Sequence, residues 1–223
     1  MKQVVFVFFL FLSSNSLFAQ PASDLPLTFL KNVDTTKPLL FYLSGDGGMN
    51  NFSKTLIQNF YNKGYSVVAL DSKDYFWKKK TPEKTAADIS QSIYFYLKKW
   101  KLKNFILIGY SFGADVAPFI FSRLPVEVNN KANQLVLLSP SQTTSFEIKI
   151  LTMFGLGESK GLSVIDEINK LNKPVLFAFG SDEKDFPMNK IKIKTKDVLT
   201  LTGGHHYDGK ETVLSQQLLK FFR

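Results

Sequence analysis

The chain has 223 residues, of which 44% are hydrophobic and 21% are charged, and its formal net charge is +9. This composition supports one compact domain with a substantial core, and it excludes a fibrous or largely disordered protein. Because the chain has no cysteine, it can form neither a disulfide framework nor a cysteine-based zinc site, and it has no thiol nucleophile.

The first 19 residues have the layout of a secretory signal peptide. Lys2 precedes an apolar run from Val4 to Leu12, and a polar stretch then ends in Leu17-Phe18-Ala19. The run is too short to cross a bilayer comfortably, so we expect cleavage after Ala19, export, and one domain over residues 20–223. An uncleaved anchor or a buried N-terminal strand is the alternative. Because Lys2 is the only charged residue in the segment, cleavage would change the net charge from +9 to +8.

The positive charge favours anionic partners, including phospholipid head groups. The lysines are scattered in short groups, however, and we expect no nucleic-acid partner. Most groups are interpreted as solvated surface, with peripheral contact to an anionic membrane as the alternative. In the group at 190–196 the lysines alternate with Ile191 and Ile193, which predicts a strand with one exposed face. The other groups lie at residues 78–80 and 98–99.

Strand-length apolar runs alternate with helical patterns along the chain after residue 37. Alternation of this kind produces parallel βαβ units, and strands that are apolar throughout indicate a sheet covered on both faces. The sequence therefore predicts a three-layer α/β sandwich with a mostly parallel sheet of about six strands. The predicted strands are 38–43, 65–70, 104–108, 134–138, 174–179 and 197–201, and the predicted helices are 52–63, 81–100, 112–124, 164–171 and 211–222.

The glycine-rich segment that follows the first predicted strand is "LSGDGG", residues 43–48. Its three glycines would let backbone amides face a ligand, and we expect one of them to stabilise a developing oxyanion. The N–H of Asp46 is the first choice and that of Gly47 the second. A flexible strand-to-helix turn is the alternative. The segment lacks the spacing and the lysine of a phosphate-binding P-loop, which argues against an NTPase.

The segment "GYSFGAD", residues 109–115, contains the pattern GxSxG between a predicted strand and a predicted helix. In a nucleophile elbow, Gly109 and Gly113 would permit a sharp turn that projects Ser111 above the sheet. The N–H of Phe112 would then face the developing negative charge. Ser111 is therefore the candidate nucleophile and Phe112 a candidate oxyanion donor. An ordinary strand-to-helix bend is the alternative.

A serine hydroxyl becomes a good nucleophile only when an imidazole can accept its proton. The chain has two histidines, His205 and His206, both in "TGGHHYDG" after the last predicted strand. In a triad with the chain order serine, acid, histidine, the base lies in the loop after the last strand, and we rank His205 above His206. The acid should follow the preceding strand. There Glu183 is favoured by its position, Asp185 is nearly as good, and Asp182 is a further alternative.

Glycine loop, serine elbow, acidic loop and histidine loop follow one another in the order of the α/β-hydrolase fold. Five segments spread over the chain are more specific than this order alone: "SGDGG" at 44–48, "DYFWKKKTPEKTAADI" at 74–89, "LIGYSFGADVAPF" at 107–119, "RLP" at 123–125 and "GGHHYDG" at 203–209. In these segments the chain resembles a narrower group, the bacterial virulence protein VirJ family, which includes the C-terminal domain of AcvB. Met49 departs from the tryptophan that usually continues the family's glycine loop, and Phe186-Pro187 stands where Cys-Pro is common.

The resemblance implies a periplasmic serine hydrolase that needs no metal or organic cofactor. Family members have been linked to type IV secretion and virulence, and the AcvB-like ones to removing lysine from lysyl-phosphatidylglycerol, an aminoacyl ester lipid. The cationic aminoacyl group of such a substrate would favour a nearby carboxylate. Asp115 lies four residues after Ser111 on the same helix face. It is a candidate for binding the substrate amine or bracing the glycine loop, with a helix-dipole role as the alternative.

Two apolar segments are candidates for contact with a lipid. One is Tyr75–Trp77, which makes Trp77 a candidate substrate-binding residue, and the other is 145–157. In the second segment Phe146, Ile148 and Ile150 alternate with charged residues, which predicts an added strand or a short cap. Packing in the core is the alternative for both segments.

Two other functions are compatible with this pattern. One is a non-catalytic envelope protein that uses a hydrolase fold to dock onto a type IV secretion complex. The other is an esterase or thioesterase with a small soluble substrate. A fold by itself does not decide among these functions.

Overall fold

The computed structural model describes residues 25–148 and 161–223. Within these residues, one sheet contains seven strands in the order β1-β3-β2-β4-β5-β8-β9. The six predicted strands are confirmed as the parallel part of this sheet. They are β2 (Leu39–Leu43), β3 (Val67–Leu70), β4 (Phe105–Tyr110), β5 (Ala132–Leu138), β8 (Val175–Gly180) and β9 (Lys196–Leu201). The predicted signal peptide lies outside the described residues.

The seventh strand, β1 (Leu27–Leu30), was not predicted from the sequence. It pairs antiparallel with β3 at the edge of the sheet, and its two central residues are exposed. Three of its four residues are apolar, but the run is short and directly follows Pro26, and a proline argues against a strand inside a sheet.

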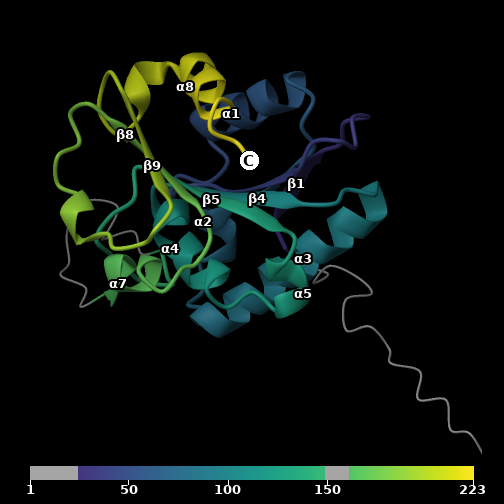
Figure 1. Ribbon diagram of the computed structural model, residues 1–223, viewed down its shortest axis with the longest axis horizontal. Coiled ribbons are helices and arrows are strands. Elements are labelled where there is room, and N and C mark those ends of the chain that lie inside the picture. The colour runs from purple at the N-terminus through teal and green to yellow at the C-terminus, as the bar shows by residue number, and fades with distance from the viewer. Residues whose placement is uncertain (1–24, 149–160) are drawn as a thin grey trace, which may run out of the picture.

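Helices cover both faces of the sheet, so the predicted three-layer sandwich is confirmed. In Figure 1, α1 (Asn51–Asn62) and α8 (Glu211–Leu218) lie above the sheet, and α3 (Pro82–Trp100), α4 (Phe112–Phe121), α5 (Val126–Asn129) and α7 (Val164–Ile168) lie below it. The one-turn helices α2 (Ser72–Tyr75) and α5 are too short to carry a periodic pattern. Among the described helices, none has the length and apolarity that a membrane span requires.

Strand β4 lies in the middle of the sheet and is buried along its whole length. Phe105 and Leu107 pack in the core with α3 and α4, whereas Ile106 and Ile108 pack in the core with α1 and α8. This alternation is the period-two geometry of a strand covered on both faces. Its consequence is that Ser111, just beyond β4, is carried by the most firmly enclosed part of the fold.

The prediction of a strand from the alternating lysines at 190–196 is wrong. A 3₁₀ helix, Met188–Lys190, is followed by irregular chain, and β9 begins only at Lys196. Ile191 and Ile193 are nevertheless buried, while the lysines that alternate with them are exposed. The edge of β8 is already paired with β9, so the preceding residues have no free strand edge to join and extend over the core instead.

The alternation that begins at Phe146 predicted an added strand, but the extra strand pairing lies a few residues earlier in the chain. Phe146 and Ile148 are buried in an irregular segment, and Ile150 lies outside the described residues. The extra pairing occurs just before, where β6 (Thr143–Thr144) pairs antiparallel with β7 (Leu162–Ser163). The apolar alternation therefore reports burial against the core rather than strand pairing.

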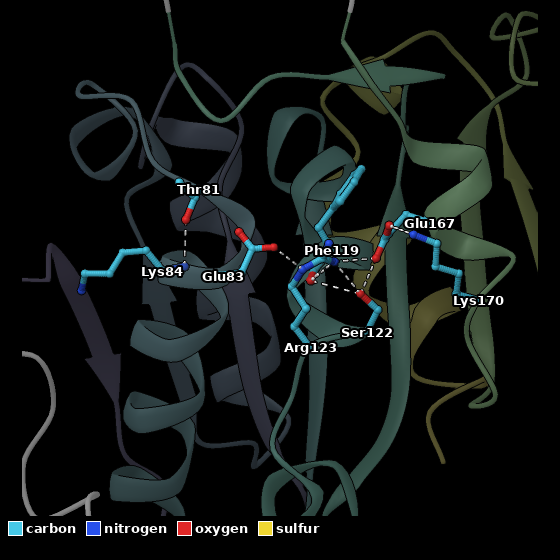
Figure 2. Close-up of polar contacts among 8 residues, drawn as sticks. All are labelled: Thr81, Glu83, Lys84, Phe119, Ser122, Arg123, Glu167 and Lys170. Carbon is cyan, nitrogen blue, oxygen red and sulfur yellow. Dashed lines mark hydrogen bonds and ion pairs between the residues drawn. The ribbon is translucent and has the colours of Figure 1, made fainter.

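An ion-pair network fixes the far end of helix α4, which begins at Phe112 (Figure 2). Arg123 lies just after α4, and its guanidinium is 3.0 Å from Glu83 on α3 and 2.6 Å from Glu167 on α7. Lys170 also contacts Glu167 at 2.6 Å. Burial raises the pKa of the Glu167 carboxyl, but hydrogen bonds from Lys170, Ser122 and Arg123 lower it more, so the net pKa is below its usual value. The network ties α4 to both neighbouring helices.

The two glutamates that share Arg123 should differ in their effect on stability. The side chain of Glu167 is 4% exposed and that of Glu83 is 71% exposed. We expect Glu167→Gln to lower the free energy of unfolding by about 2 kcal/mol, because charge-assisted hydrogen bonds are lost in a buried site. The matched control Glu83→Gln should cost less than about 1 kcal/mol, as for other exposed ion pairs. Urea denaturation measures both, and equal losses would contradict this assignment.

Candidate active site

The residues predicted to carry chemistry meet at the carboxyl edge of the parallel sheet. Ser111 follows β4, Glu183 follows β8, and His205 follows β9. The glycine loop follows β2, which pairs directly with β4. Because the carboxyl ends of parallel strands share one edge, residues far apart in the sequence are brought together there.

Ser111 sits on a strained turn. Its φ of 51° and ψ of −121° are unusual for a residue with a side chain. Helix α4 starts immediately afterwards and lies so close to β2 that a Cβ on Gly113 would be 2.4 Å from the carbonyl oxygen of Leu43. Only glycine fits there. Phe112 is the first residue of α4, so its N–H has no acceptor within the helix and is available to a ligand.

His205 joins Ser111 to Glu183. Its Nε2 is 2.8 Å from the Ser111 Oγ, and its Nδ1 is 2.8 Å from the Glu183 Oε1. A carboxylate can only accept a hydrogen bond, so Nδ1 carries the proton and Nε2 is the acceptor for the serine hydroxyl. This arrangement has the geometry of a serine nucleophile with an oriented base.

Glu183 is held from its other side as well. Its Oε2 accepts hydrogen bonds from the Ser139 Oγ and the Gly180 N–H, each at 2.7 Å. Burial raises the pKa of the Glu183 carboxyl, but the hydrogen bonds from His205, Ser139 and Gly180 lower it more, and the net pKa lies below its usual value. The carboxylate therefore remains ionised and fixed beside the imidazole at neutral pH.

The alternative base and acids lie elsewhere. His206 Nδ1 is 2.6 Å from the hydroxyl of Tyr110, and its ring packs edge-on against Phe52. Asp182 and Asp185 are exposed, and the Asp182 carboxylate accepts a 3.0 Å hydrogen bond from the hydroxyl of its neighbour Ser181. Of the three competing carboxylates in the described chain, the one that contacts His205 is Glu183.

A cavity of about 300 Å³ lies beside Ser111 and Phe112. Three acidic residues line it: Asp46 from the glycine loop, Asp115 from α4, and Glu147 from the segment after β6. Asp46 thus lies where the first-choice oxyanion donor was expected, whereas Gly47 is exposed and does not line the cavity. The chemistry of the lining suits a cationic group next to the serine.

Asp115 is buried and braces a different loop from the one predicted. Its Oδ1 accepts a hydrogen bond from the backbone N–H of Ser141, after β5, while the glycine loop is braced by Asp71, whose Oδ2 accepts from the Met49 N–H at 3.1 Å. Burial raises the pKa of the Asp115 carboxyl to about 8, the hydrogen bonds from Ser141 oppose this, and Asp46 adds to it. At neutral pH the carboxyl is mostly protonated.

Trp77, predicted as a substrate-binding residue, does not line the cavity. It is 49% exposed, and its neighbour Phe76 is fully buried and packs edge-on against Phe112 with ring centroids 5.1 Å apart. Tyr75 is buried as well, so the two aromatic residues that precede Trp77 face inward and Trp77 faces outward.

A second cavity, of about 490 Å³, lies on the other side of His205. Glu183, Ser139, Phe179 and Phe186 contribute to its walls. Asp182 and Asp185 line this larger cavity as well, so each of the two cavities contains three carboxyl groups, but the larger one also has the aromatic walls of Phe179 and Phe186. Within the described part of the chain, no group of three or more histidine and acidic side chains is arranged to hold a metal ion.

Several site residues were not identified from the sequence. Ser139, with a φ of 52°, anchors Glu183, and Ser141 anchors Asp115. Glu147 completes the acidic lining, and Tyr110 holds His206. One signal was available for Ser139: like Ser111, it follows directly after a buried parallel strand and so lies at the chemical edge of the sheet.

Comparison with known proteins matches residues 38–223 to the family described as bacterial virulence protein (VirJ). A search of curated proteins found no match. Among solved structures, Est1E from Butyrivibrio proteoclasticus has a TM-score of 0.63 at 18% identity, over 87% of this chain and 90% of that one. An esterase from Pyrococcus furiosus has a TM-score of 0.63 at 14% identity, over 87% and 83%.

A third similar structure is described as a membrane phospholipase A, a novel bacterial virulence factor. Its TM-score is 0.61 at 14% identity, over 87% of this chain and 81% of that one. At such identities these likenesses show the fold alone, which is that of the α/β-hydrolases.

The raised pKa of Asp115 predicts how stability changes with pH. Between the unfolded value of 3.8 and the folded value of about 8, the folded protein holds a proton that the unfolded chain releases. Stability is therefore lost as the pH rises through this window. Asp115→Asn keeps an acceptor for Ser141 and removes the titration, so wild type should lose on the order of a few kcal/mol relative to this variant between pH 5 and pH 8.5.

Denaturant unfolding at several pH values measures this difference. Asp185→Asn, at an exposed carboxylate in the same region, is the control and should follow the wild-type curve. Parallel stability profiles for wild type and Asp115→Asn would show that Asp115 does not titrate in this range.

Proposed function

Since the chain belongs to the bacterial virulence protein (VirJ) family, we propose that it is a serine esterase whose nucleophile is Ser111. The observation that carries this proposal is the pair of 2.8 Å hydrogen bonds that join Ser111, His205 and Glu183. The strained conformation of Ser111 supports it, because backbone strain of this kind is characteristic of a nucleophile elbow.

In the acylation step, Ser111 Oγ attacks the ester carbonyl while His205 Nε2 accepts the hydroxyl proton. Glu183 keeps the Nδ1 proton in place and stabilises the imidazolium that forms. The oxyanion receives hydrogen bonds from the N–H groups of Phe112 and Asp46. The imidazolium then protonates the departing alkoxide, the ester C–O bond breaks, and the acyl group remains on Ser111.

In the deacylation step, a water molecule takes the place of the alcohol. His205 Nε2 accepts a proton from this water as its oxygen attacks the acyl carbon, and the same proton returns to Ser111 Oγ as the acyl–serine bond breaks. The products are the free acid and the free enzyme. Because His205 protonates the alcohol, the alcohol is expected on the His205 side, towards the cavity of about 490 Å³.

We further propose that the acyl part of the substrate is cationic, as in the aminoacyl ester of an aminoacyl-phosphatidylglycerol. The support is the acidic lining beside Ser111, made by Asp46, Asp115 and Glu147. An ammonium group in this cavity would lower the pKa of Asp115 and draw off its proton, so that binding creates the ion pair. Export to the periplasm is part of the proposal and is supported by the composition of residues 1–19.

A fluorophosphonate probe tests the nucleophile. Wild-type protein should be labelled covalently, and Ser111→Ala should not. Glu183→Gln should reduce kcat for a soluble ester by roughly 10³- to 10⁴-fold, because the imidazole loses its orienting charge. Asp166→Asn removes an exposed carboxylate on α7 that lines neither cavity, and it should change kcat by less than about twofold.

Two results would contradict the assignment. Labelling that persists in Ser111→Ala would remove Ser111 from the reaction, and an equal loss in both carboxylate variants would remove the special role of Glu183. A wild-type protein that resists the probe altogether would favour a non-catalytic docking role on a hydrolase fold.

A pair of soluble esters tests the cationic acyl group. Lysine methyl ester and methyl hexanoate share one carbon chain and differ in the two amines. Asp115→Asn should raise KM for the lysine ester by about tenfold, the effect of losing one charge-assisted contact, and should leave methyl hexanoate unchanged. For wild type, KM for the lysine ester should fall as the pH rises from 6 towards 8, since Asp115 ionises there while the lysine ε-amine remains charged.

Asp166→Asn is again the matched control, because it removes one exposed carboxylate that lines neither cavity. A KM for the lysine ester that stays the same in Asp115→Asn, at every pH, would leave the esterase proposal standing and remove the cationic acyl group from it.

A further inference from the structure

The chain between β3 and α3 carries an unusual combination of side chains at the carboxyl edge of the sheet. Residues 73–80, here called the basic loop, contain four lysines, one acidic residue and the half-exposed Trp77. Lys73, Lys78 and Lys79 are exposed. The half-exposed indole thus stands among exposed ammonium groups, a combination that is typical of protein surfaces that lie at a membrane interface.

The basic loop is anchored firmly from behind. Phe76 is fully buried between Phe112 and Phe146, with ring centroids 5.1 and 5.9 Å away. Two backbone hydrogen bonds tie the loop to the segment after β6: Lys80 N–H donates to Phe146 at 2.8 Å, and Ile148 N–H donates to Phe76 at 2.9 Å. Trp77 and the lysines are thus presented on a fixed support.

The same anchor places the loop beside the active site. Phe112, against which Phe76 packs, is the residue after Ser111, and Ile148 lines the acidic cavity. The basic loop therefore lies next to the mouth of that cavity without lining it.

Within the described residues, the lysines of the basic loop form no salt bridge. Lys80 lies over the ring of Tyr75 at 5.0 Å. The exposed ammonium groups of Lys73, Lys78 and Lys79 can meet phosphate oxygens outside the protein, while the indole is suited to the boundary between head groups and acyl chains.

We propose that the basic loop docks the protein on a bilayer that contains anionic phospholipids, with Trp77 inserted at the interface and Lys78 and Lys79 against the head groups. Charge complementarity selects the partner, and the anchor through Phe76 brings the ester group of a lipid close to Ser111. The value of docking for catalysis rests on the proposed esterase function, but the binding itself does not.

A second group of lysines provides the structural control. Lys98, Lys101, Lys103 and Lys131 surround a hollow of about 700 Å³ at the amino ends of β4 and β5. The six residues of β4 separate this hollow from Ser111 by about 20 Å. A membrane bound there would leave the active site on the far side of the protein, so this group should not contribute to docking.

Vesicle binding is measured on Ser111→Ala, so that no lipid is consumed. We expect binding to vesicles of phosphatidylglycerol and phosphatidylcholine, weakening with salt, and no binding to pure phosphatidylcholine. Adding Lys78→Gln and Lys79→Gln should reduce the partition coefficient by about 25-fold, or fivefold per lysine. The control pair Lys101→Gln and Lys103→Gln removes the same charge at the opposite end and should have no effect. Trp77→Ala should weaken binding on the order of tenfold.

The two tryptophans allow a direct reading of the contact. Trp100 is buried, at 5% exposure, so phospholipids with brominated acyl chains should quench Trp77 alone, and quenching should disappear in Trp77→Ala. Equal losses from the two lysine pairs, no preference for anionic vesicles, or no quenching would each overturn the docking proposal. Fluorophosphonate labelling of wild-type protein in solution, measured in parallel, reports on the esterase separately.

Discussion

The strained conformation of Ser111 is the constraint on which the site depends. A positive φ at a serine costs on the order of 1–3 kcal/mol and persists only where the surroundings over-determine the backbone. Here β4 is buried on both faces, and α4 is pressed so closely onto β2 that Gly113 admits no side chain. At its far end, α4 is tied to α3 and α7 through Arg123. The core therefore supplies the rigidity that holds the hydroxyl towards His205.

Although the chain as a whole has a net positive charge, an acidic region and a basic region lie side by side at the carboxyl edge of the sheet. Carboxyl groups line the cavity beside Ser111, whereas the basic loop next to it presents exposed lysines. A lipid with a cationic acyl group in an anionic membrane would match both at once. Asp115 refines this picture, because its raised pKa leaves the empty cavity less negative than its composition suggests. The full negative charge develops only when a cation is bound or the pH rises.

The sequence predicted the strands of the sheet and the chain order of the serine, acid and histidine loops, because each of these features has a short local sequence pattern. Buried parallel strands are continuous apolar runs, and GxSxG marks a turn that few other structures require. Which of Asp182, Glu183 and Asp185 contacts His205 could not be predicted from the local sequence. The answer depends on Ser139, after β5, and Gly180, at the end of β8, whose hydrogen bonds direct the Glu183 carboxylate towards His205. For the same reason the pattern could not show that Phe76 rather than Trp77 faces inward. In residues 190–196 the alternation of isoleucine and lysine correctly predicted which side chains are buried, but it wrongly predicted a strand. A strand needs a free sheet edge to pair with, and the local sequence does not show whether one is available.

The turn after β5 links the two halves of the proposed mechanism. Ser139 donates to the carboxylate that orients His205, and two residues later Ser141 donates its N–H to Asp115 in the acidic cavity. An ammonium that ionises Asp115 would strengthen the hydrogen bond from Ser141, because a charged acceptor binds a donor more tightly than a neutral one. That contact would draw the 139–141 turn towards α4 and fix Ser139 more firmly against Glu183. Recognition of the acyl group and orientation of the base thus share three consecutive residues, so a cationic substrate would help to order the groups that act on it.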